Sequence, residues 1–126
     1  MAKEERKEGA PERAPDDEVE HAREERRLVR CAKCGHALTD AAARTEKDGA
    51  HRHDFVNPAG VAFRVACFRD APGCIEVGAG ETFWSWFAGY AWRHALCGRC
   101  AAHVGWSYRG KDGAAFFGLV VDRIVE

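Results

Sequence analysis

Residues 83–108 read FWSWFAGYAWRHALCGRCAAHVGWSY, and the interpretation of the whole chain starts from this stretch. A Cys-x-x-Cys pair, Cys97 and Cys100, lies inside it. Indoles beside half of a metal site are an unusual pattern for a hydrophobic core. We therefore predict a metal that stabilises the fold and indoles that line a small-molecule pocket. All the tryptophans of the protein lie here: Trp84, Trp86, Trp92 and Trp106.

A second Cys-x-x-Cys pair lies far upstream, at Cys31 and Cys34. Matched pairs at this spacing are typical of metal sites in reducing compartments, where disulfides are rare. Four thiolates form a closed tetrahedral zinc site with no open position, so the zinc would be structural rather than catalytic. Because 62 residues separate the pairs, the metal would join the two ends of a sheet domain rather than build a small zinc ribbon. The predicted zinc ligands are Cys31, Cys34, Cys97 and Cys100.

The other histidines and cysteines near these pairs are not expected to bind the metal. His36, His94 and His103 could compete as ligands, but four cysteines already complete a tetrahedral site. Cys67 falls on the apolar face of an expected strand, and we interpret it as a small buried hydrophobic residue. Cys74 follows Pro-Gly in an expected loop, and we assign it no role.

Short β-rich stretches separated by glycine turns predict an all-β domain. Turns are expected at residues 57–60 and 112–113, and the second of these marks a hairpin. Residues 37–44 could form a short turn or helix. Many short strands with little helix favour two packed or partly closed sheets. The expected strands cover residues 55–56, 61–68, 75–77, 83–87, 103–108 and 115–121.

Residues 1–29 form a charged tail that we expect to be disordered, and residues 30–126 form the folded domain. Residues 1–30 contain 8 Lys/Arg and 10 Asp/Glu, with few large aliphatic side chains. Such a segment cannot bury enough apolar area to offset the entropy cost of ordering it. A frayed helix over residues 17–27 is compatible with the sequence, and a solvated tail is favoured over a docking arm.

The chain has 126 residues and a net charge of −1, which argues against several function classes. A weak net charge gives no field that would favour nucleic acid or an anionic membrane as a partner. No apolar run approaches the roughly 18 residues of a membrane span, and no apolar stretch follows the basic residues near the N-terminus as a secretory signal requires. We therefore expect a cytoplasmic, monomeric protein without nucleic-acid or membrane partners.

The indole cluster has two interpretations. One is an aromatic core, since aromatic side chains bury large areas, and spacing alone favours it. The other is a pocket in which the expected strand at residues 83–87 places Trp84 and Trp86 on one face. Such a pocket would hold either a cation or a compact neutral ring. Glu81 is the nearest carboxylate but is not within the cluster, so we favour the neutral ring.

Three motifs follow one another along the chain, and two shorter ones add to the pattern. In this order and spacing they resemble the C-terminal thalidomide-binding (CULT) domain of cereblon. The resemblance covers about residues 30–124 and is closest to stand-alone bacterial members, which lack the other domains of cereblon. The motifs are Ser85-Trp86-Phe87-x-Gly89-Tyr90-Ala91-Trp92, Cys97-x-x-Cys100, His103-x-Gly105-Trp106, Asn57-Pro58-x-Gly60 and Phe117-Gly118-Leu119.

The resemblance implies a β-tent, a fold of two antiparallel sheets held together by a structural zinc on four cysteines. It also implies a ligand-binding pocket inside the fold. The walls of this pocket would be Trp86, Trp92 and Trp106. Tyr108 matches the aromatic residue that completes the cage.

Further ligand-binding residues are implied around this cage. Asn57, Pro58 and Phe63 match positions near the pocket rim. Ser85 lies between the residues whose backbone meets the imide edge of the ligand. Trp84 departs from the family pattern, which has Phe or His at this position, so its indole could narrow the pocket or add a wall.

The resemblance implies a non-enzymatic binding module for small molecules. The expected ligands are cyclic imides of the glutarimide and thalidomide type or uracil-like nucleosides. C-terminal cyclic imides on damaged proteins, which cereblon recognises, are a further expected ligand class. The ubiquitin-ligase role of cereblon is not expected here, because no adaptor-binding domain is present in the sequence.

Two alternative functions stay open. One is a reader of methylated ammonium groups or of modified peptide termini. The other is an enzyme like the methionine sulfoxide reductases, which share the β-tent fold and two Cys-x-x-Cys pairs. Such an enzyme needs a reactive cysteine on a late strand, but no cysteine follows Cys100, which leaves Cys67 as the only candidate on a strand.

Overall fold

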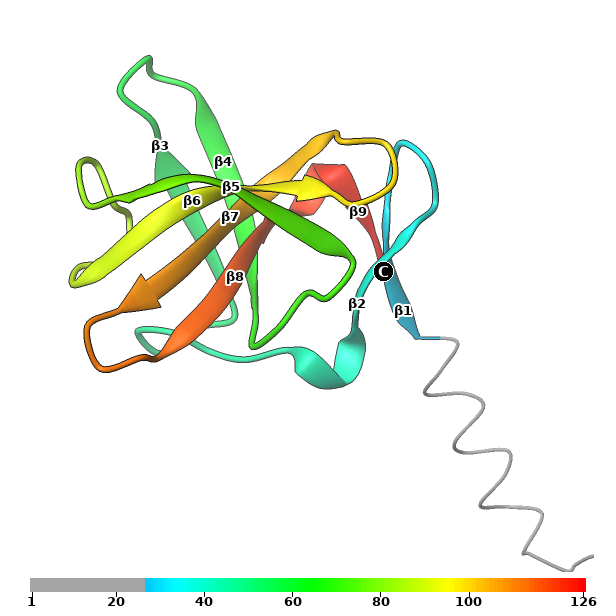
Figure 1. The fold of residues 1–126 in the computed structure, drawn as a ribbon, viewed down its shortest axis with the longest axis horizontal. Helices are drawn as coiled ribbons and strands as arrows, with labels where there is room; N and C mark the ends of the chain where they lie inside the picture. Colours follow the sequence, from blue (N-terminus) through cyan, green and yellow to red (C-terminus); the bar gives the residue numbers. More distant parts are fainter. Residues whose placement is uncertain (1–26) are drawn as a thin grey trace, which may run out of the picture.

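The computed structural model describes residues 27–126, which form two antiparallel β-sheets (Figure 1). The small sheet has the strand order β2-β1-β9, and the large sheet has the order β3-β4-β8-β7-β6-β5. The predicted all-β fold of two antiparallel sheets is therefore confirmed. The elements are β1 (Leu28–Cys31), β2 (Ala37–Asp40), η1 (Ala41–Ala43), β3 (Arg52–Val56), β4 (Ala62–Phe68), β5 (Cys74–Glu81), β6 (Tyr90–Cys97), β7 (His103–Gly110), β8 (Ala115–Val120), η2 (Val121–Arg123) and β9 (Ile124–Val125).

Strand β1 includes residues that the sequence assigned to the tail. Leu28 and Val29 lie in β1, and Val29 is fully buried. The folded part therefore starts before the predicted boundary at Arg30, because two aliphatic side chains are enough to add a strand to the small sheet. The predictions for residues 1–26 lie outside the described residues. Within residues 27–126, no helix has the length and apolar composition needed to cross a membrane.

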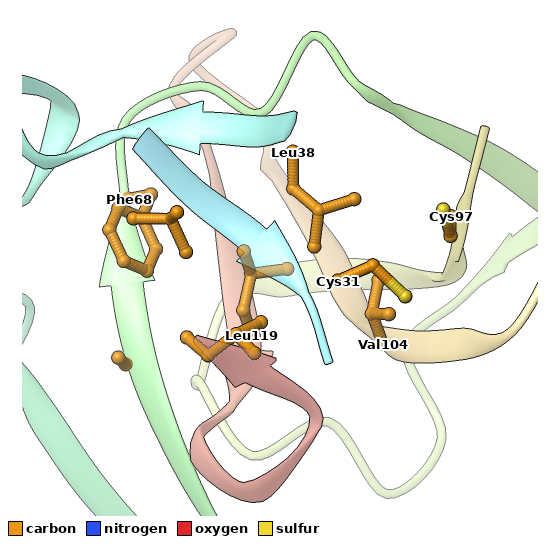
Figure 2. Packing of buried hydrophobic residues seen from close by; sticks show 9 residues of the cluster. Cys31, Leu38, Phe68, Cys97, Val104 and Leu119 are labelled. Carbon is orange, nitrogen blue, oxygen red and sulfur yellow. The ribbon is translucent and has the colours of Figure 1, made fainter. Parts of the chain in front are cut away.

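The main core lies between the two sheets. Figure 2 shows Leu38 of β2 packed among side chains of the large sheet, which include Val104 of β7 and Leu119 of β8. All three side chains are buried. Burying a side chain of this size contributes about 1.5–3 kcal/mol. The small sheet is therefore held on the large sheet by apolar contacts as well as by the cysteines described below.

Several of the predicted strands and turns are confirmed. The expected strand at residues 61–68 is β4, in which Val65 and Cys67 are buried on one face. The turn at residues 57–60 is stabilised by Asn57, whose Oδ1 accepts hydrogen bonds from two backbone N–H groups of the turn. The hairpin at residues 112–113 joins β7 to β8, and Gly113 adopts a φ of 87° there. Residues 37–44 form β2 followed by the 3₁₀ turn η1, so the expectation of a turn or helix was half right.

The strand predicted at residues 83–87 is wrong. These residues lie in the loop between β5 and β6, and Trp84 has a left-handed φ of 59°. Aromatic residues favour strands because strands offer a half-buried packing surface, and a loop can offer the same burial through tertiary contacts. Phe87 is 2% exposed and packs edge-to-face against Phe116, with ring centroids 4.9 Å apart. The loop is therefore fixed by its aromatic side chains rather than by strand pairing.

Gly105 is a point of close strand packing that a mutation can test. A Cβ atom at this position would overlap the carbonyl oxygen of Gly118 and lie 2.9 Å from the Cα of Leu119. We expect Gly105→Ala to lower the free energy of unfolding by about 1–3 kcal/mol, as overpacking does in other cores. Urea denaturation would measure the change. Gly110→Ala is the matched control, because its Cβ would meet side-chain atoms, which can move; equal losses in both variants would contradict the prediction.

Candidate functional site

The four predicted metal ligands come together at one point between the sheets. Cys31 ends β1 and Cys34 lies in the turn that follows, while Cys97 ends β6 and Cys100 lies in the turn that follows that strand. Their sulfur atoms all lie within 4.8 Å of one another. The cluster therefore links the small sheet to the large sheet, as the spacing of the pairs predicted.

The two Cys-x-x-Cys turns have the same backbone hydrogen bonds. The carbonyl of Cys31 accepts from the N–H of Gly35 at 2.8 Å, and the carbonyl of Cys97 accepts from the N–H of Ala101 at 2.9 Å. Gly35 and Ala101 both have a left-handed φ, of 80° and 65°. Each turn thus directs two sulfur atoms to the same side, which is what two halves of one metal site require.

The distances between the sulfur atoms fit a metal rather than disulfides. The Sγ atoms of Cys31 and Cys100 are 3.8 Å apart, and those of Cys34 and Cys97 are 3.6 Å apart. A disulfide would need about 2.05 Å. Four sulfurs at about 2.3 Å from a tetrahedral zinc lie about 3.8 Å from one another. The four cysteines could therefore hold a metal ion, and their separations suit zinc.

The surroundings of the cluster shift the pKa values of Cys97 and Cys34 in opposite directions. Burial raises the pKa of Cys97. The backbone N–H groups of Cys100 and Arg99, which point at its sulfur, have the opposite effect, and the net result is a pKa lowered to about 7. The backbone of His36 lowers the pKa of Cys34, but burial and the neighbouring thiols raise it to about 11. The thiolate is the form that binds metal, so Cys97 is better prepared for binding than Cys34.

The remaining cysteines lie outside this cluster. Cys67 is fully buried under the aromatic core, and burial raises the pKa of its thiol to about 11. This agrees with its interpretation as a small hydrophobic residue. Cys74 was expected in a loop, but it starts β5 and pairs directly with Cys97 on β6. Burial raises the pKa of the Cys74 thiol to about 12.

An aromatic cavity of about 590 Å³ lies on one face of the large sheet. Trp92 on β6 pairs with Tyr108 on β7, and His94 pairs with Trp106, so all four side chains point to this face. The loop between β5 and β6 closes one side of the cavity, and the β3–β4 hairpin provides the other. The lining residues are Asn57, Pro58, Phe63, Glu81, Phe83, Trp84, Trp86, Trp92, His94, His103, Trp106 and Tyr108.

The indoles meet as perpendicular walls. Trp86 and Trp106 have ring centroids 4.8 Å apart and planes at 76°, and Phe63 stands at 86° to Trp106. Trp86 is held from behind by Phe55, which stacks on it with centroids 4.8 Å apart. The Nε1–H of Trp92 donates to the carbonyl of Phe83 at 2.8 Å, which joins the third indole to the loop. These contacts form a corner with flat apolar faces rather than a filled core.

All the ligand-binding residues predicted from the sequence line this cavity except Ser85. Ser85 is not among the lining residues, since its hydroxyl donates to the carbonyl of Phe87 at 3.0 Å on the other side of the loop. Tyr108 reaches the lining but is only 2% exposed, so it supports the cavity floor more than it walls the cage. Trp84 is 60% exposed at the mouth, where it adds to the rim.

The loop leaves backbone groups available beside the indoles. Among the described residues, no other protein group accepts a hydrogen bond from the N–H groups of Trp84 and Trp86. The left-handed φ of Trp84 lies between these two groups in the loop. Unpaired backbone groups at a cavity are candidates for hydrogen bonds with a bound molecule. The cavity thus combines flat apolar walls with a polar edge.

Four lining residues were missed from the sequence. Phe83 was assigned to the opposite face because residues 83–87 were read as a strand, and it is 71% exposed at the mouth. The reading of Glu81 as outside the cluster is wrong, because it ends β5 directly opposite Trp92. His94 and His103 line the cavity with ring nitrogens 3.4 Å apart. The position of His94 two residues after Trp92 was a signal for a shared face, whereas Glu81 had no such signal.

The environment of His103, which lines the cavity, favours a neutral imidazole. Burial lowers the pKa of His103; the Gly105 carbonyl opposes this effect in part, and the neighbouring His94 and Arg123 lower the pKa further. That carbonyl lies 2.8 Å from the Nε2 of His103. The imidazole stays neutral near pH 7, so it adds a polar but uncharged surface to the cavity.

Comparison with known proteins supports one relationship. No protein-family model matches the chain. Cereblon of Danio rerio is 37% identical over 54 residues, which are 43% of this chain and 12% of that protein. The cereblons of Drosophila grimshawi and Drosophila melanogaster are both 44% identical over 46 residues, which are 33% of this chain and 7% and 8% of those proteins. Over these 46–54 residues the chain is therefore similar to a small part of cereblon, and it spans only about a tenth of the length of these relatives.

Proposed function

We propose that the aromatic cavity binds a compact ring with a polar edge, of the cyclic imide or uracil type. The observation that carries this proposal is the corner of Trp86, Trp106 and Phe63 beside unpaired backbone N–H groups. The ring would place its C–H face on the indoles and its imide edge against the loop backbone. The similarity to cereblon supports this choice, because the resemblance of the motifs implied the same ligand class.

The residues of the cage have separate tasks in this proposal. Trp86, Trp92 and Trp106 provide apolar area, and the backbone N–H groups of Trp84 and Trp86, on either side of Ser85, provide hydrogen bonds that orient the ring. Asn57 and Pro58 limit the rim from the β3–β4 hairpin. A peptide ending in a cyclic imide belongs to the same ligand class, since its terminal ring would enter the cavity past Phe83 and Trp84 at the mouth.

We also propose that the four-cysteine cluster holds a structural zinc. Zinc binds thiolate donors, and a tetrahedral zinc site matches the separations of 3.6 and 3.8 Å between the sulfur atoms. When bound, the ion supplies a rigid link between β1 and β6, with no open coordination position for catalysis. In this proposal the module binds rather than catalyses, because Cys67, the candidate for a reductase nucleophile, is buried with a raised pKa.

A second candidate ligand is an organic cation such as a methylated ammonium group. It is favoured by the position of Glu81, whose carboxylate lies in the lining of an aromatic cavity. Indole faces attract cations, and a carboxylate strengthens such a site. The neutral ring remains the first proposal, because His94 and His103 provide no charge partner for a cation and the backbone edge suits an imide.

Tryptophan fluorescence can separate these candidates. We expect glutarimide to change the emission of the full chain in a saturable way, because all four tryptophans line the cavity. Uridine and a trimethyl-lysine peptide would be titrated in parallel at constant ionic strength. If only the trimethyl-lysine peptide gives a saturable change, the ligand class is an organic cation and not a cyclic imide. If no ligand changes the emission at millimolar concentration, the proposed function is contradicted.

A further inference from the structure

A second cavity, of about 450 Å³, lies on the opposite face of the large sheet from the aromatic cavity. Along β6 and β7, Trp92 and Trp106 point to the aromatic cavity, whereas Arg93, Ser107 and Arg109 point to the second one. The sheet separates the two spaces, so one small molecule cannot occupy both. The second cavity is therefore a distinct candidate site.

Cationic side chains dominate the charged lining of this cavity. Arg93, Arg109 and Lys111 face it, and Glu76 of β5 is the single carboxylate among its lining residues. The side chains of Arg93 and Arg109 are about half exposed, so solvent reaches them from the open side. The lining thus carries more positive than negative charge, in a protein whose net charge is −1.

Glu76 holds the two guanidinium groups near each other. Its Oε1 atom lies 3.9 Å from Arg93 Nη1 and 3.8 Å from Arg109 Nη2. The same oxygen accepts a hydrogen bond of 2.7 Å from the hydroxyl of Ser107, which is buried. A carboxylate fixed in this way positions both arginines on one small area of the cavity wall.

The arginines retain their hydrogen-bonding capacity. Contacts of 3.8–3.9 Å are longer than N–H···O hydrogen bonds, which are about 2.7–3.2 Å. Among the described residues, neither guanidinium donates a hydrogen bond to another protein group. Each guanidinium has five N–H donors in a planar fork that matches an oxyanion. Two like charges that share one carboxylate repel each other, and a bound anion would relieve this repulsion.

We propose that this cavity is a binding site for a small oxyanion, a phosphate or carboxylate group. Arg93 and Arg109 hold the anion through charge-assisted hydrogen bonds, and Lys111 adds positive charge at the edge. Glu76 and Ser107 are positioning residues that act through the arginines. The proposal does not depend on the ligand of the aromatic cavity.

Titration of the full chain with inorganic phosphate and, separately, with acetate tests this site. Binding would be followed by calorimetry at constant ionic strength, since screening weakens exposed charges. We expect saturable binding of at least one anion, and about tenfold or greater weakening in Arg93→Gln and in Arg109→Gln. Stronger binding of phosphate or of acetate would identify the preferred class of anion.

Arg64→Gln is the matched control, because it removes the same charge from β4, where Arg64 pairs with Asp54. The control is expected to bind the anion as the unchanged protein does, and thermal unfolding would verify that every variant is folded. If anion binding is weakened equally in Arg93→Gln, Arg109→Gln and Arg64→Gln, the effect is a general attraction between charges, and the proposal is overturned. Absence of saturable binding for both anions would also overturn it.

Discussion

Replacing Cys97 with serine is expected to remove zinc from the protein and to abolish its cooperative unfolding transition. Backbone N–H groups lower the pKa of Cys97 to about 7, and its sulfur lies 3.6 Å from that of Cys34 in the cluster. Structural zinc sites contribute about 10 kcal/mol or more of apparent folding free energy. The free energy of unfolding of a small domain is only about 5–15 kcal/mol in total. Loss of the zinc would therefore remove most or all of the stability of this domain.

Cys74→Ser is the matched control for this experiment. Cys74 lies directly opposite Cys97 in the β5–β6 pair, but it is not part of the four-sulfur cluster. Metal analysis per mole of protein and circular dichroism melting curves would be recorded for both variants. We expect the control to retain one zinc and a cooperative transition. A folded Cys97→Ser variant with unchanged metal content would contradict the site, and iron in place of zinc would contradict the identity of the metal.

Replacing Trp106 with alanine is expected to weaken glutarimide binding by about 30-fold or more. The indole of Trp106 lies at the centre of the corner, in edge-to-face contact with Trp86 and Phe63. Removing a wall of this size forfeits about 2 kcal/mol of apolar contact with a bound ring, which corresponds to about 30-fold in affinity. Trp86→Ala is expected to act in the same direction, with an additional cost to stability, because Phe55 stacks on Trp86.

Trp106→Phe separates the loss of a wall from the loss of the fold. Phenylalanine retains a flat apolar face, so we expect this variant to bind more tightly than Trp106→Ala but less tightly than the unchanged protein. Calorimetry would measure affinity, and zinc content would verify that each variant is folded. An affinity for glutarimide that is the same in Trp106→Ala and in the unchanged protein would show that the ring binds elsewhere.

The metal cluster is the part of the candidate site that could be read most directly from the sequence. Two pairs of cysteines with the same spacing specify two similar turns, and each turn needs only local backbone hydrogen bonds to form. The strand β4 and the hairpin at Gly113 were predictable for the same reason, since alternation and turn chemistry act over a few residues.

The prediction from the sequence is wrong in the loop between β5 and β6. Residues 83–87 have the composition of a strand, yet the left-handed φ of Trp84 and the burial of Phe87 make them a loop. A local pattern records which side chains prefer burial, but it does not record which neighbours provide it. For the same reason, Phe83 was assigned to the face opposite Trp84 and Trp86, although it lines the cavity with them.

By itself, the sequence determined the all-β fold, the four thiols and the aromatic character of one face, because these depend on residue type and short-range spacing. Only the tertiary structure decided how the cavity is completed. Glu81 faces Trp92 and His94 faces Trp106 because of the register between β5, β6 and β7. Register is fixed by packing between distant segments, so residues that are unremarkable in sequence become walls of the cavity or, like Arg93, of the cavity behind it.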